Sequence, residues 1–235
     1  MKAYYDIHIH SILSSCGDIS QTPNNIFNMC MLKKLNVISI TDHNTALQYK
    51  TFEKLKDSYD FLLIYGMEIS VNEGFHVLAY FEELDEVMRL EEIIDSSLDK
   101  SIIAPQEQVI CDEYDEVESI IPYWKNQKIK YKFTEIIDII RELNGIVVPA
   151  HIERKGSGIL SFIKDFSLYD IDAIEIDCKS NIETLEKEYP YIKKYKYLFN
   201  SDAHSIEMIN EPLNYMELDD LSFKSFRKWI RSNKS

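Results

Sequence analysis

The sequence has little cysteine, no long apolar segment and no surplus of positive charge. Its four cysteines, Cys16, Cys30, Cys111 and Cys178, include no CxxC pair, so we expect reduced thiols and no thiolate zinc site. No apolar run approaches the roughly 18 residues that span a bilayer, and the N-terminal stretch MKAYYDIHIH has no apolar signal segment. We therefore expect a cytoplasmic protein without a membrane partner.

The formal net charge of −14 results from 26 basic and 40 acidic residues. Duplex nucleic acid is bound largely through Lys and Arg contacts to phosphates, so this balance predicts no duplex nucleic acid partner. The 235 residues, 45% of them hydrophobic, suffice for a substantial core and predict a single domain over residues 1–235. Nothing in the sequence indicates an oligomeric state.

Short β-rich segments alternate with helical segments along the chain. The expected strands are Ala3–His10, Val37–Thr41, Leu62–Ser70, His76–Phe81, Ile146–Ala150, Ala173–Asp177 and Tyr197–Asn200. The expected helices are Asn24–Leu35, Thr45–Tyr59, Leu84–Leu98, Thr134–Leu143, Ile159–Phe166, Ile182–Glu188 and Leu221–Ser232. Runs such as VISIT and GIVVPA are apolar at consecutive positions, which predicts an α/β fold with a mostly parallel sheet buried on both faces. Residues 106–118 (QEQVICDEYDEVE) break the pattern, and we expect an irregular acidic excursion there.

All six histidines fall in or beside the expected strands, and most lie at the carboxyl ends. They are His8, His10, His43, His76, His151 and His204. This end of the strands is the functional edge of barrels and open α/β sheets. Glu68 in GMEIS and Asp202 in SDAH belong to the same strand ends. Imidazoles and carboxylates gathered at one edge predict a site for divalent metal ions.

The segment His8-Ile9-His10 places two imidazoles on one face of a strand, with Ile7 and Ile9 on the other. Asp6 would share the imidazole face and orient one of the rings from behind. Glu68 lies in an otherwise apolar strand, where a carboxylate is costly unless it is paired or bound to a metal.

Taken together, these motifs resemble the polymerase and histidinol phosphatase (PHP) superfamily of metal-dependent phosphoesterases. The motifs are DIHIH, TDH, GMEIS followed by HVLAY, PAH and SDAH, and they extend in this order from His8 to His204. The resemblance implies a distorted (β/α)7 TIM-like barrel with a trinuclear metal centre at the carboxyl ends of its strands.

The resemblance also implies a set of ligands for each metal. The first metal would be held by His8, His10, Glu68 and Asp202; the second by Glu68 as a bridge, His76 and His151; the third by Asp18, His43 and His204. Many members place the carboxylate of the first loop five residues after the second histidine of HxH, whereas Asp18 follows His10 by eight. Without Asp18 the centre would be binuclear.

Imidazole and carboxylate ligands suit Mn, Zn or Fe, so we expect two or three such ions as cofactors. Two metals about 3.5–4 Å apart activate water and polarise a phosphoryl group, which predicts a hydrolase. Glu68 would set the metal spacing and Asp202 would assist proton transfer. The expected substrate is a small phosphomonoester or nucleotide, and Arg154 and Lys155, which follow His151, are the candidates to bind its phosphate.

Three other functions stay open on the sequence. An exonuclease could use the same metals on short single-stranded nucleic acid, although no stripe of basic and aromatic residues indicates a strand groove. A hydrolase of amide or acyl bonds could also use such metals, but Arg154 and Lys155 favour an anionic substrate. A non-catalytic regulatory PHP module is expected to lose metal ligands, and all nine candidate ligands are present.

Overall fold

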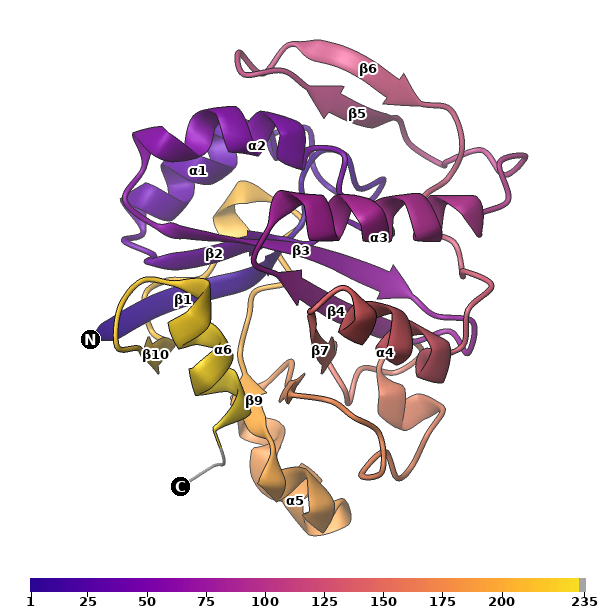
Figure 1. Cartoon of the computed structure of the whole chain (residues 1–235), viewed down its shortest axis with the longest axis vertical. Helices are drawn as coiled ribbons and strands as arrows, with labels where there is room; N and C mark the ends of the chain where they lie inside the picture. Colours follow the sequence, from indigo (N-terminus) through magenta and orange to yellow (C-terminus); the bar gives the residue numbers. More distant parts are fainter. Residues whose placement is uncertain (233–235) are drawn as a thin grey trace.

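The fold is built on a mixed six-stranded sheet with helices on both sides (Figure 1). The computed structural model describes residues 1–232. Its strands are β1 (Lys2–Ile9), β2 (Val37–Ile40), β3 (Leu62–Ser70), β4 (His76–Phe81), β5 (Gln108–Cys111), β6 (Val117–Ile121), β7 (Ile146–Pro149), β8 (Ala173–Glu175), β9 (Lys196–Leu198) and β10 (Tyr215–Glu217). Its α-helices are α1 (Pro23–Leu32), α2 (Tyr49–Leu55), α3 (Leu84–Ser96), α4 (Phe133–Glu142), α5 (Ile182–Glu188) and α6 (Phe223–Arg231). The expected α/β class is confirmed, and the sheet itself is mixed.

The strands of the main sheet follow the order β10-β1-β2-β3-β4-β7. Strands β1, β2 and β3 pair in parallel, but the pairs β3–β4, β4–β7 and β1–β10 are antiparallel. The prediction of a mostly parallel sheet was therefore wrong. Only residues 71–75 connect β3 to β4, which is too short for the crossover that a parallel pair requires.

The antiparallel pairing of β3 and β4 explains why His76 lies at the start of a strand. In the register of this pair, His76 is opposite Ser70, the last residue of β3. The first residue of β4 is thereby placed at the same edge of the sheet as the carboxyl ends of β1, β2 and β3. Glu68 and His76 are consequently close enough for a contact between side chains.

A register shift interrupts β1 between Asp6 and Ile9, where this strand pairs with β2. Ile7 and Ile9 belong to two different core clusters, although a regular strand would turn both to one face. Asp6 accepts hydrogen bonds from the backbone N–H groups of Ser201 (3.1 Å) and Asn210 (2.9 Å). Asp6 thus anchors the segment after β9 and is not the group that orients a histidine ring.

Backbone hydrogen bonds extend the curvature of the sheet beyond β7. Strands β8 and β9 form a separate parallel pair. The N–H of Asp172, just before β8, donates to Val147 in β7 (2.9 Å), and the N–H of His10 donates to Ala203 after β9 (2.9 Å). The sheet is therefore a curled half-barrel whose two sides are linked through β8 and β9.

Two apolar clusters pack on the sheet. The larger one contains buried side chains from α1, α2, α3 and α4, and the smaller one contains Phe223, Phe226 and Ile230 of α6. In Figure 1, α1, α2 and α3 lie on one side of the sheet and α6 on the other. This packing buries both faces of the sheet. The histidines lie at the edge that is formed by the ends of its strands.

The expected acidic excursion at residues 106–118 contains β5 and the start of β6, which together form an antiparallel hairpin outside the main sheet, beyond α3 (Figure 1). The hairpin is held to α2 by hydrogen bonds from Gln48 Nε2 (2.8 Å) and Thr51 Oγ1 (2.6 Å) to the carbonyl of Cys111.

The expected helix Ile159–Phe166 is shorter, a single 3-10 turn at Ile159–Ser161. Among the described residues, no helix has both the length and the apolar character needed to cross a membrane.

Candidate metal centre

The carboxylate of Glu68 is the centre of the cluster, and imidazole nitrogens surround both of its oxygens. Glu68 lies in β3 and is 1% exposed. The nitrogens nearest to Oε1 are His76 Nδ1 (2.9 Å), His151 Nε2 (3.1 Å) and His8 Nε2 (3.4 Å). Those nearest to Oε2 are His43 Nδ1 (2.9 Å) and His10 Nε2 (3.3 Å). A carboxylate with different neighbours on each oxygen has the arrangement that a bridge between two cations requires.

Each histidine comes from a different strand end, apart from the pair on β1. His43 follows β2, His76 begins β4, and His151 follows β7. His204 lies after β9, and its ring is 4.5 Å from that of His10, centroid to centroid. The six histidines that the sequence singled out therefore lie in one cluster.

Asp202 is the second carboxylate of the cluster. Its Oδ1 lies 3.1 Å from His8 Nε2 and 3.0 Å from His10 Nε2. Its Oδ2 accepts a short hydrogen bond from Arg154 Nη1, and Nη2 of the same guanidinium contacts Asp177 Oδ1 at 2.6 Å. Arg154 therefore lies beside the cluster, but two carboxylates occupy its donors. Lys155, its neighbour, is exposed.

Glu175, at the end of β8, supports the cluster from behind, and the sequence analysis did not identify it. Its carboxylate accepts from His8 Nδ1 (2.9 Å) and from the backbone N–H of His151 (2.8 Å). Because Nδ1 of His8 donates to Glu175, its Nε2 faces Glu68 and Asp202. The sequence did carry a signal: Glu175 lies in the run AIEI, where a buried carboxylate needs a partner just as Glu68 does.

The pKa shifts show how charge is distributed in the cluster. Burial opposes a charged His10, but the carboxylates of Asp202 and Glu68 outweigh burial and raise the pKa of His10 to about 9. At His43 burial dominates and lowers the pKa to about 3. Burial alone would raise the pKa of Glu68, yet the surrounding imidazoles hold it well below its usual value. The carboxylates are thus ionised, and a metal cation would replace protons on imidazoles such as His10.

The donor set fits divalent metal ions. Within residues 1–232, three ring nitrogens and one carboxylate oxygen of the cluster are buried without a hydrogen-bond partner: His8 Nε2, His43 Nδ1, His151 Nδ1 and Glu68 Oε2. The contact of His43 with Glu68 is short but not aligned as a hydrogen bond. Buried polar atoms are otherwise almost always paired. Ligand atoms of His8, His10, Glu68 and Asp202 lie within 4.8 Å of one another, as do those of His43, Glu68 and His76.

Two of the six non-glycine residues with positive φ in the described chain belong to the cluster. His151 has a φ of 28° and Asp202 a φ of 50°, in the left-handed region that residues with a Cβ avoid. Each such residue costs on the order of 1–3 kcal/mol, and such residues gather at functional sites. The hydrogen bond from the N–H of His151 to Glu175 holds one of these two conformations in place.

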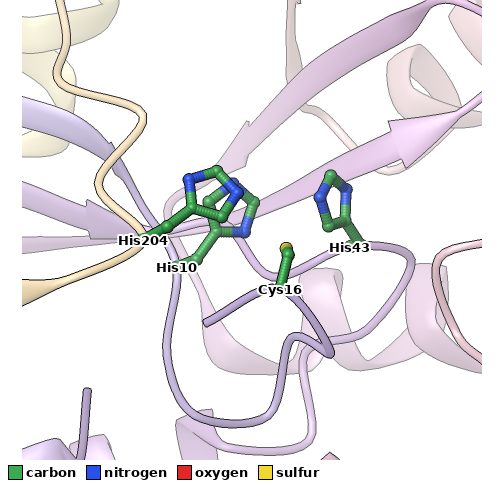
Figure 2. A group of neighbouring side chains, drawn as sticks. All are labelled: His10, Cys16, His43 and His204. Carbon is green, nitrogen blue, oxygen red and sulfur yellow. The ribbon is translucent and has the colours of Figure 1, made fainter. Parts of the chain in front are cut away.

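The first loop, between β1 and α1, brings Cys16 to the cluster and leaves the Asp18 carboxylate outside it. Cys16, His10, His43 and His204 each offer a ligand atom within 4.8 Å of the others (Figure 2). Asp18 is exposed, and its carboxylate accepts from the N–H of Ser20 (2.8 Å). The described geometry therefore gives the proposed third metal no carboxylate from Asp18. In the sequence, the sign that Cys16 could reach the cluster was its position six residues after His10. It was overlooked because the cysteines form no CxxC pair.

Comparison with known proteins adds information on the fold. No family model matches the chain. An uncharacterized protein of Methanocaldococcus jannaschii is 32% identical over 91 residues, which cover 35% of this chain and 52% of that protein. The chain thus spans about half the length of this curated relative.

Three solved structures have a similar fold. Endonuclease Q of Pyrococcus furiosus, a lesion-specific endonuclease, matches with a TM-score of 0.75 at 21% identity over 98% of this chain and 56% of its own. Endonuclease Q in complex with a 27-mer duplex containing an abasic lesion matches with a TM-score of 0.73 at 21% identity over 98% of this chain and 57% of that chain. A two-domain protein of Bacteroides vulgatus that contains a predicted PHP-like metal-dependent phosphoesterase matches with a TM-score of 0.56 at 15% identity, over 98% of this chain and 63% of its own. The chain therefore shares its fold with these proteins, one of which contains a predicted PHP-like phosphoesterase, and this is the kind of fold that the motifs predicted.

The same comparison overturns the expected partners, which were a small phosphorylated substrate and no duplex nucleic acid. Endonuclease Q shares this fold and binds a 27-mer duplex. The inference from the net charge of −14 failed because that value sums the whole surface, whereas binding depends on the potential at the contact face, where bound cations add positive charge.

Proposed function

We propose that this chain, which has the PHP fold, is a metal-dependent hydrolase that cleaves phosphodiester bonds in nucleic acid. The observation that carries the proposal is the Glu68 carboxylate, whose two oxygens face five imidazoles, with Asp202 beside them. Imidazoles and carboxylates in this arrangement are ligands for Mn, Zn or Fe.

The residues that would hold the first metal are His8, His10, Glu68 and Asp202, and those for the second are Glu68, His76 and His151. Bound metals of this kind polarise phosphoryl oxygens and lower the pKa of water. The protein groups have separate tasks. Glu68 fixes the spacing of the two positions, Glu175 holds the ring of His8, and Arg154 orients Asp202 through its Oδ2. Because Arg154 is already bound by Asp202 and Asp177, we assign it to positioning rather than to substrate.

We further propose that the curled sheet is a distorted seven-stranded barrel of PHP type. Strands β1, β2, β3, β4, β7, β8 and β9 would form its wall, closed by the hydrogen bonds of Asp172 with Val147 and of His10 with Ala203. The cluster would then lie at the mouth of the barrel, which the antiparallel β4 reaches with its amino end and the other strands with their carboxyl ends.

A nucleic acid substrate is supported by the fold. It is shared over 98% of this chain with Endonuclease Q, a lesion-specific endonuclease that was also solved with a duplex containing an abasic lesion. A lesion that lets one nucleotide leave the helix would give the metals access to that phosphate, because flipping costs least at damaged positions.

The proposal is tested with three labelled DNA substrates of one sequence: a duplex with a single abasic site, the intact duplex, and the single strand. The protein is supplied with Mn²⁺, Zn²⁺ or Fe²⁺, and the products are resolved on a denaturing gel. We expect metal-dependent cleavage next to the lesion and little cleavage of the intact duplex. Progressive shortening of the single strand alone would favour an exonuclease, and no cleavage of any substrate would refute the proposal.

Glu175 provides a test of metal binding that does not depend on the substrate. The change Glu175→Gln keeps the shape but removes the negative charge behind His8, which lowers the basicity of the ring. We expect metal affinity to fall about 10–100-fold, the usual cost of losing a group behind a metal ligand. The matched control is Glu142→Gln on the exposed side of α4, which should bind metal like the wild type. Equal affinities in isothermal titration of the two variants would contradict the role of Glu175.

A further inference from the structure

The loop between β1 and α1 is fixed in place by Asp42, the residue before His43. Asp42 Oδ1 accepts from the N–H of Ser11 (2.7 Å) and from Ser14 Oγ (2.6 Å), and Asp42 Oδ2 accepts from Ser11 Oγ (2.6 Å). At Gly17 the backbone approaches so closely that an added Cβ would lie 2.3 Å from the carbonyl oxygen of Ser11. The position of Cys16, between Ser14 and Gly17, is therefore set by the fold and not by a free loop.

The thiol of Cys16 faces histidines that the first two metal positions do not fully use. In Figure 2, its sulfur lies between the rings of His10 and His204 on one side and the ring of His43 on the other. His43 is 4% exposed, and its Nδ1 lies 2.9 Å from Glu68 Oε2 without forming a hydrogen bond to any described residue. A ring nitrogen of His43 also lies within 4.8 Å of ligand atoms of Cys16, His10 and His204. A thiol grouped in this way with imidazoles has the composition of a metal site.

From this geometry we infer that Cys16 is a thiolate ligand of a third metal ion, held together with His43 and His204. The inference rests on the proposed metal centre and adds a ligand of a different chemical class to it. His10 lies in the same group, but its Nε2 faces Glu68 and Asp202, so we assign it to the first metal.

A cation at this position would need an anionic ligand. Burial and the carboxylates of Glu68 and Asp42 raise the pKa of the Cys16 thiol, so the cation itself would have to displace the proton. His43 and His204 are neutral donors. Of the two carboxylates of the cluster near them, Glu68 already faces five imidazoles, and Asp202, 3.7 Å from His204 Nδ1, is engaged by His8, His10 and Arg154. Asp18 cannot balance the charge from its present position because its exposed carboxylate caps the N–H of Ser20. Only its backbone approaches the site, through the bond from Asp18 N–H to the carbonyl of His204 (2.8 Å). A thiolate would also make this position select Zn²⁺ or Fe²⁺ over Mn²⁺ or Mg²⁺, since soft ligands prefer the former.

Two cysteines of the described chain are exposed, Cys16 and Cys178, which gives the test an internal control. Cys178 lies after β8, and its thiol contacts Ser180 Oγ at 2.9 Å. A thiol-reactive dye should label both cysteines in metal-depleted protein. Saturating Zn²⁺ should protect Cys16 and leave the labelling rate of Cys178 unchanged, as measured by mass spectrometry of the labelled peptides.

Cobalt supplies a second readout. Loading with Co²⁺ should produce a sulfur-to-cobalt charge-transfer band in the near ultraviolet, which imidazole and carboxylate ligands do not give. The band should persist in Cys178→Ser and disappear in Cys16→Ser. Elemental analysis should show one equivalent of zinc fewer in Cys16→Ser than in Cys178→Ser, while Asp18→Asn should keep the wild-type zinc content.

The outcomes separate this inference from the proposed function. If the protein binds two or more metals but Cys16 stays reactive and the cobalt band is absent, the thiolate ligand is refuted and the metal centre stands. Loss of one metal in Asp18→Asn but not in Cys16→Ser would likewise refute it in favour of the carboxylate. If the wild-type protein binds no metal at all, the inference and the proposed function both fail.

Discussion

Replacing Glu68 with glutamine should reduce phosphodiester cleavage by more than about 100-fold, beyond the 10–100-fold that changes behind metal ligands produce. The amide has the same shape, but it lacks the charge that both oxygens present to the imidazoles. One end of the side chain becomes an NH₂ donor and can no longer share an electron pair with a metal. The two metal positions would then lose their common ligand.

Three further measurements and a second variant make the Glu68 result interpretable. Circular dichroism and the melting temperature of Glu68→Gln should show a folded protein, and elemental analysis should show reduced metal content. Glu68→Asp keeps the charge but shortens the reach, so its activity should fall between those of Glu68→Gln and the wild type. Near-normal turnover in Glu68→Gln, with Glu142→Gln as the surface control, would rule out the bridge.

Replacing Lys125 with methionine should destabilise the protein by about 3–5 kcal/mol, the cost of breaking a buried ion pair by removing one partner. The Lys125 ammonium is 1% exposed and contacts Glu91 Oε1 and Asp95 Oδ1, each at 2.7 Å. Glu91 on α3 is itself buried, and its other oxygen accepts from the N–H of Ala46 (2.6 Å). Without Lys125, the charge of Glu91 would stay buried and uncompensated.

The free energy of unfolding, measured in urea, checks this prediction against two controls. Lys100→Met removes the other lysine that contacts Asp95, but its side chain is 56% exposed, so we expect a loss of less than about 1 kcal/mol. The double change Lys125→Met and Glu91→Gln removes both charges and should recover part of the loss. Equal effects of Lys125→Met and Lys100→Met would show that burial of the pair is unimportant.

Lys125 also connects the stability of the outer segment with the candidate metal centre. Its carbonyl accepts from Asn44 Nδ2 (2.7 Å), and Asn44 directly follows His43. The preceding residue, Trp124, donates from its indole N–H to Ser15 Oγ (3.0 Å), next to Cys16. The segment after the β5–β6 hairpin thus braces two loops of the cluster, so Lys125→Met should also weaken metal binding.

Much of the architecture could be predicted from the sequence, because the apolar runs specify where strands are buried. The bounds of β3 and β4 agree with the expected Leu62–Ser70 and His76–Phe81. The six histidines could be identified because they are few and because each follows or begins an apolar run. Pairing direction was not encoded in those runs. The short connection between β3 and β4 made that pair antiparallel, against the expectation from composition.

The sequence by itself determined which residues form the cluster: six imidazoles with Glu68 and Asp202 at strand ends, a set that resembles the PHP superfamily in order and type. Only the tertiary structure decided which other side chains surround these residues. A register shift in β1 moved Asp6 away from the rings, so Glu175, from a strand far along the chain, holds His8 instead. Asp42 fixed the first loop so that Cys16 faces the cluster and Asp18 faces solvent. These assignments depend on contacts between residues that are distant in sequence, and local patterns of apolar and polar residues do not specify such contacts.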